Sequence, residues 1–461
     1  MNYERLFADH RGQIVKAGLI GAGQFGASLI AQAKSIPMLS VPAVCDRDVE
    51  RALDASRAAG LTDVRVCANA ADAGRAMEAG TLVIVSDAAM LMDLPLDVIV
   101  EATGNPEAAA ANGEAAIAAG KHLVLASKEA ESVVGPLLSK RARDAGLVAT
   151  LVEGDQPSLL VGLHSWARLL GLEVVCAGKS SEYDFVFDPS AETLTWQDMT
   201  VSAAGLGLHW ALADGAVDLT LAARAEILAE APQRTVPDLC EMGAVANATG
   251  LRPDMPEFHV PIARAVEVPE IFRPRADGGI LSGGGVIDVF NCLRRPDEQS
   301  FAGGVFVVVR CDNAETWEVL RGKGIPVSRS GSHAMLYNPS HLLGVEAPIS
   351  ILSAALLGHP TGGAAPTPVV DLVARTNRAW RAGEVLEITD HHHHEVAGLD
   401  PMLIDAAPAT AANPAPYYMA AGRPLTRDVP AGSAVTVDMI DPPDGSALWR
   451  LRAEQDETFG P

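Results

Sequence analysis

Short apolar runs alternate with helical patterns along the first 150 residues of the chain. Runs rich in valine, leucine and isoleucine are typical of buried parallel strands, and the stretches between them carry apolar residues at the spacing of a helix. The predicted strands are 17–20, 41–45, 64–67, 82–85, 97–101, 122–126 and 147–152. This regular alternation predicts an α/β domain built on a doubly wound parallel sheet.

The pattern is less regular after residue 157. It predicts helices at 157–170, 219–229 and 238–249, and strands at 172–177, 286–290, 304–309 and 334–337. A further helix is predicted from Pro339, which suits the first helical position with Asn338 as its N-cap, and 350–357 continues it. We expect a helix at 369–379 and, from 381 onwards, short strands separated by turns and prolines. The predicted domains are 1–157, a middle α+β domain at 158–365, and a small β domain at 366–461.

The first predicted strand leads into a glycine-rich turn, Gly21-Ala-Gly23-Gln24-Phe25-Gly26, and a helical pattern follows it. In a dinucleotide-binding βαβ unit these glycines permit a tight turn, close approach of a pyrophosphate, and close packing of helix on strand. The pyrophosphate then lies at the positive N-terminus of the helix. The turn is therefore a candidate cofactor site that includes Gln24 and Phe25, although such turns also connect elements that bind nothing.

The second predicted strand ends in Asp46, 20 residues after Gly26. A carboxylate at this position accepts a hydrogen bond from the ribose 2′-hydroxyl and repels a 2′-phosphate, which favours NAD. Arg47 follows directly and favours NADP. The pattern therefore predicts NAD or NADP as the cofactor. The alternative is that Asp46 only caps the helix predicted at 49–58.

Polar residues follow the later strands of the predicted sheet. Ligands of such sheets bind beyond the carboxyl ends of the strands, so residues at these ends converge on one crevice with the glycine turn. They are Thr103, Gly104, Asn105, Lys128, Asp155 and Gln156. We expect the first three to contact the cofactor and Gln156 to contact the substrate.

The composition narrows the function classes. The chain has 461 residues, 48% of them hydrophobic and 20% charged, which suits a globular protein of two or three domains. Its 35 basic and 58 acidic residues give a net charge of −23, which argues against nucleic-acid and anionic-membrane binding. We therefore expect a small-molecule substrate.

The six cysteines are scattered singly, so we expect reduced thiols and neither a zinc site nor a disulfide framework. The polar, acidic start shows no signal-peptide pattern, and no apolar run approaches the roughly 18 residues of a membrane helix. We expect a cytoplasmic protein that forms a homo-oligomer.

Several motifs resemble known oxidoreductases. Glu101-Ala-Thr-Gly104 and Ala-Ser-Lys128 resemble homoserine dehydrogenase, in which such a lysine follows the strand lining the nicotinamide site. Ser-Lys-Glu here is also similar to the corresponding motif of 1-deoxyxylulose-5-phosphate reductoisomerase. A longer match is to the bacterial predicted homoserine dehydrogenase family with a C-terminal SAF domain, which includes reductoisomerase-like enzymes. The segments that carry it are 134–137, 153–157, 177–179, 241–250, 273–279, 337–346 and 427–432.

The resemblance implies an open sheet in the middle domain, whose face covers the nicotinamide. Residues 417–439 resemble the SAF signature, which implies a small β-clip domain at the end. The chain departs from the reductoisomerase-like members at 234–237, where it lacks their lysine, and after Lys179, where it reads Ser-Ser-Glu-Tyr-Asp-Phe. Both departures fall where a substrate phosphate or hydroxyl would be bound.

Hydride transfer requires a group that exchanges a proton with the substrate oxygen. Lys128 and Lys179 are the main catalytic candidates, each at a predicted strand end, where a nicotinamide and a second cation would lower the lysine pKa. Asp155 is predicted to hold a lysine, orient a water, or bind a metal in a reductoisomerase-type reaction. His341 is predicted either to bind the substrate or to cap a helix. Further substrate-binding candidates are Tyr183, Arg275 and Tyr337. Each of these residues can instead be a solvated strand end or part of a structural ion pair.

The run Asp390-His391-His-His-His394-Glu395 suggests a metal site, but four consecutive imidazoles cannot all face one ion. We interpret it as an exposed turn and predict no protein-held metal. A divalent metal is expected only if the enzyme is reductoisomerase-like.

The sequence predicts an NAD(P)-dependent oxidoreductase that acts on a small hydroxylated or phosphorylated carbonyl or alcohol. Deoxyxylulose-phosphate reductoisomerization and homoserine dehydrogenation are narrower alternatives implied by the resemblance. A non-catalytic regulator that binds a dinucleotide is the alternative from another class.

Overall fold

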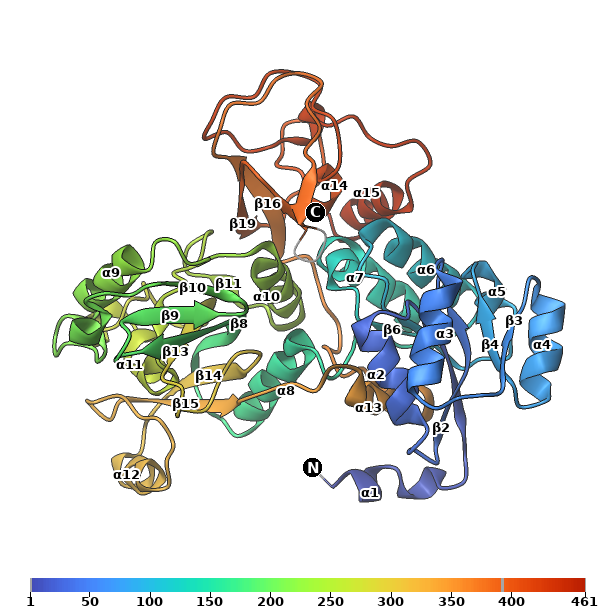
Figure 1. Ribbon diagram of the computed structural model, residues 1–461, viewed down its shortest axis with the longest axis horizontal. Helices are drawn as coiled ribbons and strands as arrows, with labels where there is room; N and C mark the ends of the chain where they lie inside the picture. Colours follow the sequence, from blue (N-terminus) through green and yellow to red (C-terminus); the bar gives the residue numbers. More distant parts are fainter. Residues whose placement is uncertain (1, 391–393, 461) are drawn as a thin grey trace.

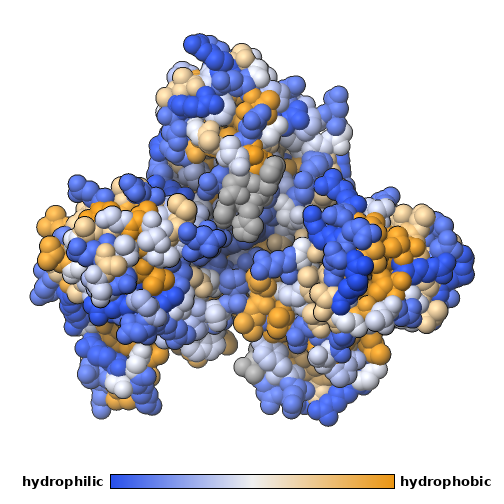
Figure 2. Space-filling model, in the orientation of Figure 1, coloured by the Kyte–Doolittle hydropathy of each residue, from blue (hydrophilic) through white to orange (hydrophobic). Residues whose placement is uncertain are grey.

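The computed structural model describes residues 2–390 and 394–460, and it has three lobes. The N-terminal lobe lies on the right of Figure 1, the middle lobe on the left, and the C-terminal lobe above their junction. The space-filling view shows the same three lobes, with a notch between the lower two (Figure 2). Helices α7 (Lys128–Asp144) and α10 (Val236–Thr249) pack against each other where the lobes meet.

The N-terminal lobe is built on a parallel sheet of seven strands in the order β3-β4-β2-β1-β5-β6-β7. The strands are β1 (Val15–Ile20), β2 (Leu39–Cys45), β3 (Val64–Val66), β4 (Leu82–Val85), β5 (Val98–Glu101), β6 (His122–Leu125) and β7 (Ala149–Leu151). Helices lie between them: α2 (Gln24–Ala33), α3 (Val49–Ala58), α4 (Ala70–Glu78), α5 (Ala89–Met92), α6 (Pro106–Ala118) and α7. Short helix α1 (Tyr3–Leu6) precedes the sheet. Strands β4 and β5 are buried along their whole length, as a sheet covered on both faces requires. The predicted doubly wound α/β fold is confirmed.

The middle lobe contains a mixed sheet of eight strands. They are β8 (Val174–Asp188), β9 (Thr193–Trp196), β10 (Met199–Ser202), β11 (Arg252–Pro253), β12 (Ile262–Ala263), β13 (Val286–Arg294), β14 (Val305–Arg310) and β15 (His333–Asn338). The helices are α8 (Gln156–Leu169), α9 (Val217–Ile227), α10, α11 (Val268–Ile271) and α12 (Ala314–Gly322). The 15-residue strand β8 pairs in parallel with β13 and antiparallel with β14. Lys179 therefore lies inside a long strand, and the predicted strand end at this lysine is wrong.

The helix predicted from Pro339 is also wrong. Asn338 ends β15, and the chain then runs without regular structure to the single turn Leu343–Val345. Helix α13 (Ala347–Leu352) and the π-helical turn Ser353–Leu357 follow. Leu343 has a left-handed conformation at this point, with a φ of +54°, and a continuous α-helix cannot pass through such a residue.

Residues 343–357 pack back onto the N-terminal lobe. Gly344 lies so close to Phe25 and Leu29 of α2 that a Cβ atom there would collide with their backbone. Ala347, Ile351 and other side chains of α13 join the buried cluster around β1 and α2. The core of the N-terminal lobe is thus completed by a segment far along the chain.

The C-terminal lobe begins with β16 (Val370–Thr376), where a helix was predicted at 369–379. This prediction is wrong because the segment pairs antiparallel with β19 (Leu399–Asp405), and its β-branched residues suit a pleated strand. The remaining elements are β17 (Ile388–Asp390), β18 (Glu395–Val396), α14 (Tyr417–Ala420) and α15 (Ala447–Phe459). His391–His393 lie outside the described residues.

Helix α15 returns to the N-terminal lobe and packs on α6 and α7 (Figure 1). Glu107 of α6 accepts hydrogen bonds from the Ser446 hydroxyl at 2.5 Å and the Ala447 amide at 2.6 Å, so it caps the start of α15. Within residues 2–390 and 394–460, no helix is long and apolar enough to span a bilayer.

Candidate active site

The glycine turn has the shape that a pyrophosphate requires. Gly21 has a φ of +99°, and a Cβ atom there would collide with the Ala102 carbonyl. At Gly26 a Cβ atom would collide with the Gly21 carbonyl, so this glycine permits the close packing of α2 on β1. A Cβ atom at Gly23 would meet nothing within 4 Å, which leaves open space at the helix N-terminus. The turn therefore fits a dinucleotide pyrophosphate.

Asp46 faces the same turn from the end of β2. One of its oxygens accepts a hydrogen bond from the Ala22 amide at 2.8 Å, and the other accepts one from the Asp48 amide at 2.9 Å. Helix α3 is capped by Asp48, so Asp46 does not cap it. Asp46, Arg47 and Arg51 line one cavity with Gly21 and Gly23, of about 980 Å³ including the solvent at its mouth. One carboxylate and two guanidinium groups thus line this cavity, which are the groups that bind a ribose 2′-hydroxyl or 2′-phosphate in dinucleotide-binding sheets.

The end of β5 connects this cavity to α7. The Thr103 hydroxyl donates to the buried Glu101 carboxylate at 2.6 Å, and the Gly104 amide donates to the Ser127 hydroxyl at 2.9 Å. Asn105 caps α6 through the Ala108 amide. Thr103 and Asn105 line the cavity together with the glycine turn, and the Ser127 contact places the first turn of α7 beside the β5 strand end.

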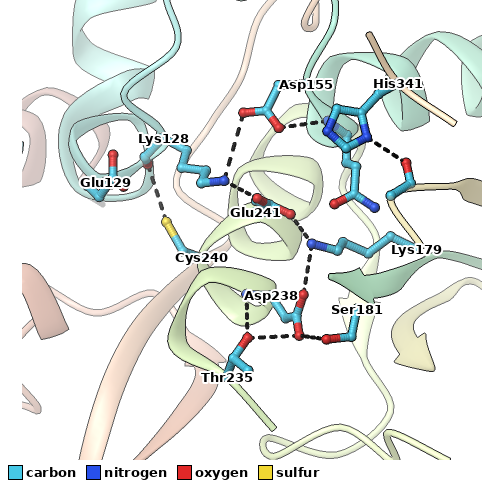
Figure 3. Close-up of polar contacts among 12 residues, drawn as sticks. Lys128, Glu129, Asp155, Lys179, Ser181, Thr235, Asp238, Cys240, Glu241 and His341 are labelled. Atoms are coloured by element: carbon cyan, nitrogen blue, oxygen red, sulfur yellow. Dashed lines mark hydrogen bonds and ion pairs between the residues drawn. The ribbon is translucent and has the colours of Figure 1, made fainter. Parts of the chain in front are cut away.

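Beyond this edge, side chains from four elements form one ionic cluster (Figure 3). Lys128 begins α7, Asp155 caps α8, and Lys179 comes from β8. Asp238 and Glu241 stand three residues apart on one face of α10. The structure therefore gathers three of the four predicted catalytic residues in one network with two carboxylates that were not predicted.

Glu241 joins the two lysines. One of its oxygens pairs with Lys128 and the other with Lys179. Lys179 also pairs with Asp238 at 2.8 Å, and Lys128 lies 3.9 Å from Asp155. Asp238 accepts further hydrogen bonds from the hydroxyls of Ser181 at 2.7 Å and Thr235 at 2.8 Å. Two cations and three carboxylates thus share one network.

The two lysines differ in their access to solvent. The side chain of Lys179 is 2% exposed, whereas those of Lys128 and Asp155 are 23% and 19% exposed. A substrate that enters from the sheet edge would therefore meet Lys128 and Asp155 first. Lys179 lies behind Glu241 and holds it in place.

The charges in the cluster fix its protonation states. Burial lowers the pKa of Lys128, but Asp155, Glu241 and Glu129 outweigh burial and hold this pKa well above its ordinary value. Asp238 and Glu241 likewise overcome burial and raise the pKa of Lys179. Burial alone would raise the pKa of Glu241. Both lysines outweigh burial and lower this pKa to about 2. The predicted lowering of the lysine pKa is wrong for the protein alone, because three carboxylates surround the two cations.

His341 and Gln156 lie at the border of the cluster. His341 points toward Asp155 in Figure 3, and its Nδ1 lies 2.8 Å from the Gly303 carbonyl. This contact places a proton on Nδ1 and leaves Nε2 available toward the site. Gln156 is buried and donates to the carbonyls of Ser180 and Gly304, so it holds α8 against the middle sheet.

The other predicted substrate-binding residues lie elsewhere. Tyr183 is buried in β8 and stacks on Phe185. Arg275 is exposed on the short turn Arg275–Asp277. Tyr337 packs on Phe301 and lines a separate cavity of about 800 Å³. The structure does not bring these three side chains into the ionic cluster.

Asp238 and Glu241 carried a signal in the sequence. Between Val236 and Val245 they are the only charged residues of an otherwise apolar helix, and their spacing of three places them on the same face. The pattern Thr235-x-x-Asp238 also marks the start of the helix. In the structure the Thr235 side chain accepts a hydrogen bond from the Asp238 amide. Buried carboxylates at this spacing require cations, and Lys128 and Lys179 provide them.

Among residues 2–390 and 394–460, no group of three or more histidine, cysteine, aspartate or glutamate side chains is arranged to hold a metal ion. Two lysines occupy the spaces between the carboxylates of the cluster.

Two family models match separate parts of the chain. Residues 17–148 match the NAD-binding domain of homoserine dehydrogenase, and residues 234–347 match the catalytic domain of oxidoreductase DRL. The first match contains the glycine turn and Lys128, and the second contains Asp238, Glu241 and His341. The chain therefore combines a nicotinamide-dinucleotide-binding domain with an oxidoreductase catalytic domain. No curated protein matches it.

Solved structures are similar to parts of this chain at low identity and low TM-score. A dehydrogenase from Chromobacterium violaceum is 18% identical with a TM-score of 0.27, over 37% of this chain and 46% of that one. The 1-deoxy-D-xylulose 5-phosphate reductoisomerase from Zymomonas mobilis, in complex with NADPH, is 22% identical with a TM-score of 0.28, over 37% and 46%. The chain thus spans less than half of the length of each, and these likenesses carry no information on the substrate.

Proposed function

We propose that the chain is an NAD(P)-dependent oxidoreductase that transfers hydride between the nicotinamide and a small hydroxylated or phosphorylated carbonyl or alcohol. In this proposal Lys128 exchanges the proton with the substrate oxygen. The observation that carries it is the position of Lys128, a partly exposed cation among carboxylates, next to the strand ends that follow the cofactor cavity. When bound, the nicotinamide supplies or accepts the hydride.

The charge state of Lys128 suits reduction of a carbonyl group. The carboxylates around it keep it protonated, and an ammonium group both stabilises a developing alkoxide and donates a proton to it. Lys179 is closed off from solvent and pairs with Asp238 and Glu241, which makes it the group that positions Glu241. We therefore place the proton transfer at Lys128 and a positioning role at Lys179.

A reductoisomerase of the deoxyxylulose-phosphate type is the second candidate, which the resemblance of the Ser-Lys-Glu motif at the start of α7 favours. The segment Arg234-Thr-Val-Pro237 lacks the lysine of the resembled enzymes, and the cluster holds lysines between its carboxylates. We therefore rank this candidate below a simple dehydrogenase. For homoserine dehydrogenase, the support comes from the match to its NAD-binding domain. A non-catalytic regulator would not require the ion pairs of Lys128 beside the cofactor cavity.

The test is a substrate screen followed by substitution of Lys128. Aldehydes, keto sugars, keto acids and deoxyxylulose phosphate are offered with NADH or NADPH, with and without Mg²⁺, and absorbance at the nicotinamide band is measured. For the substrate found, we expect Lys128→Met to lower kcat/KM about 10²- to 10⁴-fold. Cofactor binding, measured by fluorescence, is expected to change less than twofold.

Lys140→Met is the matched control, because Lys140 stands on the same helix and, among residues 2–390 and 394–460, forms an ion pair with Asp144 alone, at the surface. It is expected to retain full activity. Full activity in Lys128→Met would refute the assignment of the proton donor. Turnover of deoxyxylulose phosphate that requires Mg²⁺ would replace the first candidate by the second.

A further inference from the structure

We infer that the cavity beside Tyr337 is a second ligand site, which binds a small carboxylate with an apolar or aromatic body. The cavity measures about 800 Å³ with the solvent at its mouth, a size typical of small-molecule sites. Its lining includes no residue of the ionic cluster or of the cofactor cavity. The inference does not depend on the proposed function.

The cavity and the ionic cluster lie on opposite faces of the middle sheet. Tyr337 of β15 pairs with Phe306 of β14, and Phe306 pairs with Gly178 of β8. Residues paired across strands share a face, whereas neighbours along one strand point to opposite faces. Lys179 follows Gly178, so its side chain points away from the face that carries Tyr337.

Much of the cavity lining is apolar. Leu293, Phe301, Met335 and Tyr337 contribute to it, and all but Tyr337 are buried. The rings of Phe301 and Tyr337 lie 5.5 Å apart between centroids, with their planes tilted by 53°. Such a surface suits an aromatic or branched apolar group.

Arg264 gives the cavity a hydrogen-bond donor without an acceptor. Its Nη2 donates to Glu298 at 2.7 Å, but its Nε is buried and has no partner in the part of the chain that the structure describes. Arg294 also lines the cavity, but its Nε and Nη2 already donate to Asp184 at 2.8 to 3.0 Å. A buried donor without an acceptor is costly, and a ligand carboxylate would supply the acceptor.

Trp210 adds a third guanidinium group to this place. The guanidinium carbons of Arg264 and Arg295 each lie 4.8 Å from the centroid of the Trp210 ring. With Arg294, three guanidinium groups thus face the two carboxylates that pair with them. The local charge is positive and favours an anionic ligand, although the whole chain is acidic.

The loops that line the cavity continue into the active site. Phe301 lines the cavity, and two residues later the Gly303 carbonyl accepts a hydrogen bond from His341 at 2.8 Å. Tyr337 and Pro339 also line the cavity and shortly precede His341. A ligand that contacts both loops would therefore restrict the motion of His341.

The experiment measures binding of phenylacetate to the full chain by isothermal titration calorimetry. Phenylacetamide has nearly the same shape without the charge, and phenethylamine carries the opposite charge. We expect phenylacetate to bind with a Kd of about 1 mM or lower. The other two probes are expected to bind at least about tenfold more weakly, because they lack the charge-assisted hydrogen bond.

Arg264→Met removes the donor, and Arg295→Met is the matched control. Arg295 stacks on the same tryptophan at the same distance but does not line the cavity. We expect Arg264→Met to weaken phenylacetate binding at least about tenfold and Arg295→Met to stay within about twofold of the parent chain. If Arg264→Met fails to fold, Tyr337→Glu decides, because it places a repelling carboxylate at the cavity. Its control is Val319→Glu, at an exposed position of α12 outside the cavity.

Equal binding of the three probes would overturn the inference, as would the absence of phenylacetate binding or equal binding by a variant and its control. The connection to the active site is tested by modification of His341 with diethyl pyrocarbonate, followed by mass spectrometry. Saturating phenylacetate is expected to slow this modification about fivefold or more, a usual size for coupling between two sites. An unchanged rate would refute the connection. Neither readout requires a substrate, so a failed substrate screen would refute only the proposed function.

Discussion

Gly23 and Gly26 stand three residues apart in one turn, yet a side chain has different consequences at each. At Gly26 it would collide with backbone and disturb the fold, whereas at Gly23 it would enter the space reserved for the pyrophosphate. The φ of Gly23 is −67°, which any residue adopts. We expect Gly23→Asp to weaken NADH or NADPH binding at least about tenfold through charge repulsion, without loss of stability. Fluorescence titration and thermal unfolding measure the two quantities.

Gly74→Asp is the control for this variant. It adds the same charge at a glycine of α4 whose Cβ position is also open, but it lies outside the cofactor cavity. Equal binding by the two variants would show that the pyrophosphate does not lie at the glycine turn.

Single residues could be predicted where their position follows from the sheet. The proximity of Lys128 and Asp155 could be predicted because the strand ends of a parallel sheet meet at one edge. The burial of Lys179 could not be found, because it depends on how far β8 continues and on its pairing with two other strands. The depth of a side chain in a mixed sheet is a tertiary property.

At the scale of elements, helix α7 contains a buried carboxyl group, that of Glu131. Glu131 is 7% exposed, and its carboxyl lies over Gly135, where a Cβ atom would collide with it. Burial raises the pKa of Glu131 from 4.5 to about 7. Because the folded chain holds this proton more tightly than the unfolded chain, the stabilising effect is complete below pH 4.5 and is lost as the pH rises through 7.

Glu131→Gln removes this dependence, since glutamine does not titrate. The parent chain loses stability from pH 5 to pH 8 as Glu131 ionises, whereas the variant does not. We therefore expect the difference in the free energy of unfolding, variant minus parent, to increase by about 2 to 3 kcal/mol over this range. Urea unfolding at the two pH values measures it, with Glu78→Gln, at an exposed position in α4, as the control. A difference that is the same at both pH values would show that Glu131 titrates normally.

Elements with strong local patterns were predicted well, including the strands of the first sheet and helices α8, α9 and α10. Two of the predictions that failed, the helix at 369–379 and the helix from Pro339, have causes in contacts between distant parts of the chain. Segment 369–379 was predicted to be a helix because it mixes apolar and polar residues. Its partner strand β19 lies more than twenty residues later in the sequence, so a local pattern does not reveal the pairing. The segment after Asn338 has good helix-start residues, but it must cross α2 at Gly344, and this close contact overrides the local preference.

At the scale of the whole molecule, Arg452 ties α15 to the C-terminal lobe. Its side chain is 1% exposed and pairs with Asp371 of β16 at 2.6 and 2.8 Å and with Asp456 at 2.8 Å. We expect Arg452→Met to destabilise the chain by about 3 to 5 kcal/mol, because it leaves the buried Asp371 without its cation. The midpoint of urea unfolding, followed by tryptophan fluorescence, measures the loss.

Arg450→Met provides the comparison on the same helix. Arg450 is 47% exposed and pairs with Glu114 and Glu454 at the surface, so its loss should cost no more than about 1 kcal/mol. Equal destabilisation by the two variants would show that burial of the Arg452 pair does not matter.

The return of residues 343–357 to the N-terminal lobe also determines when this lobe can fold during synthesis. Ile351 and Leu352 belong to its apolar core, but the ribosome makes them about 200 residues after the last strand of the sheet, β7. Synthesis proceeds at about 5 to 20 residues per second, so β1 and α2 of the first lobe keep an uncovered apolar face for roughly 10 to 40 s. The nascent chain therefore exposes an apolar surface that a chaperone can bind, and this exposure ends only when the middle domain has been made.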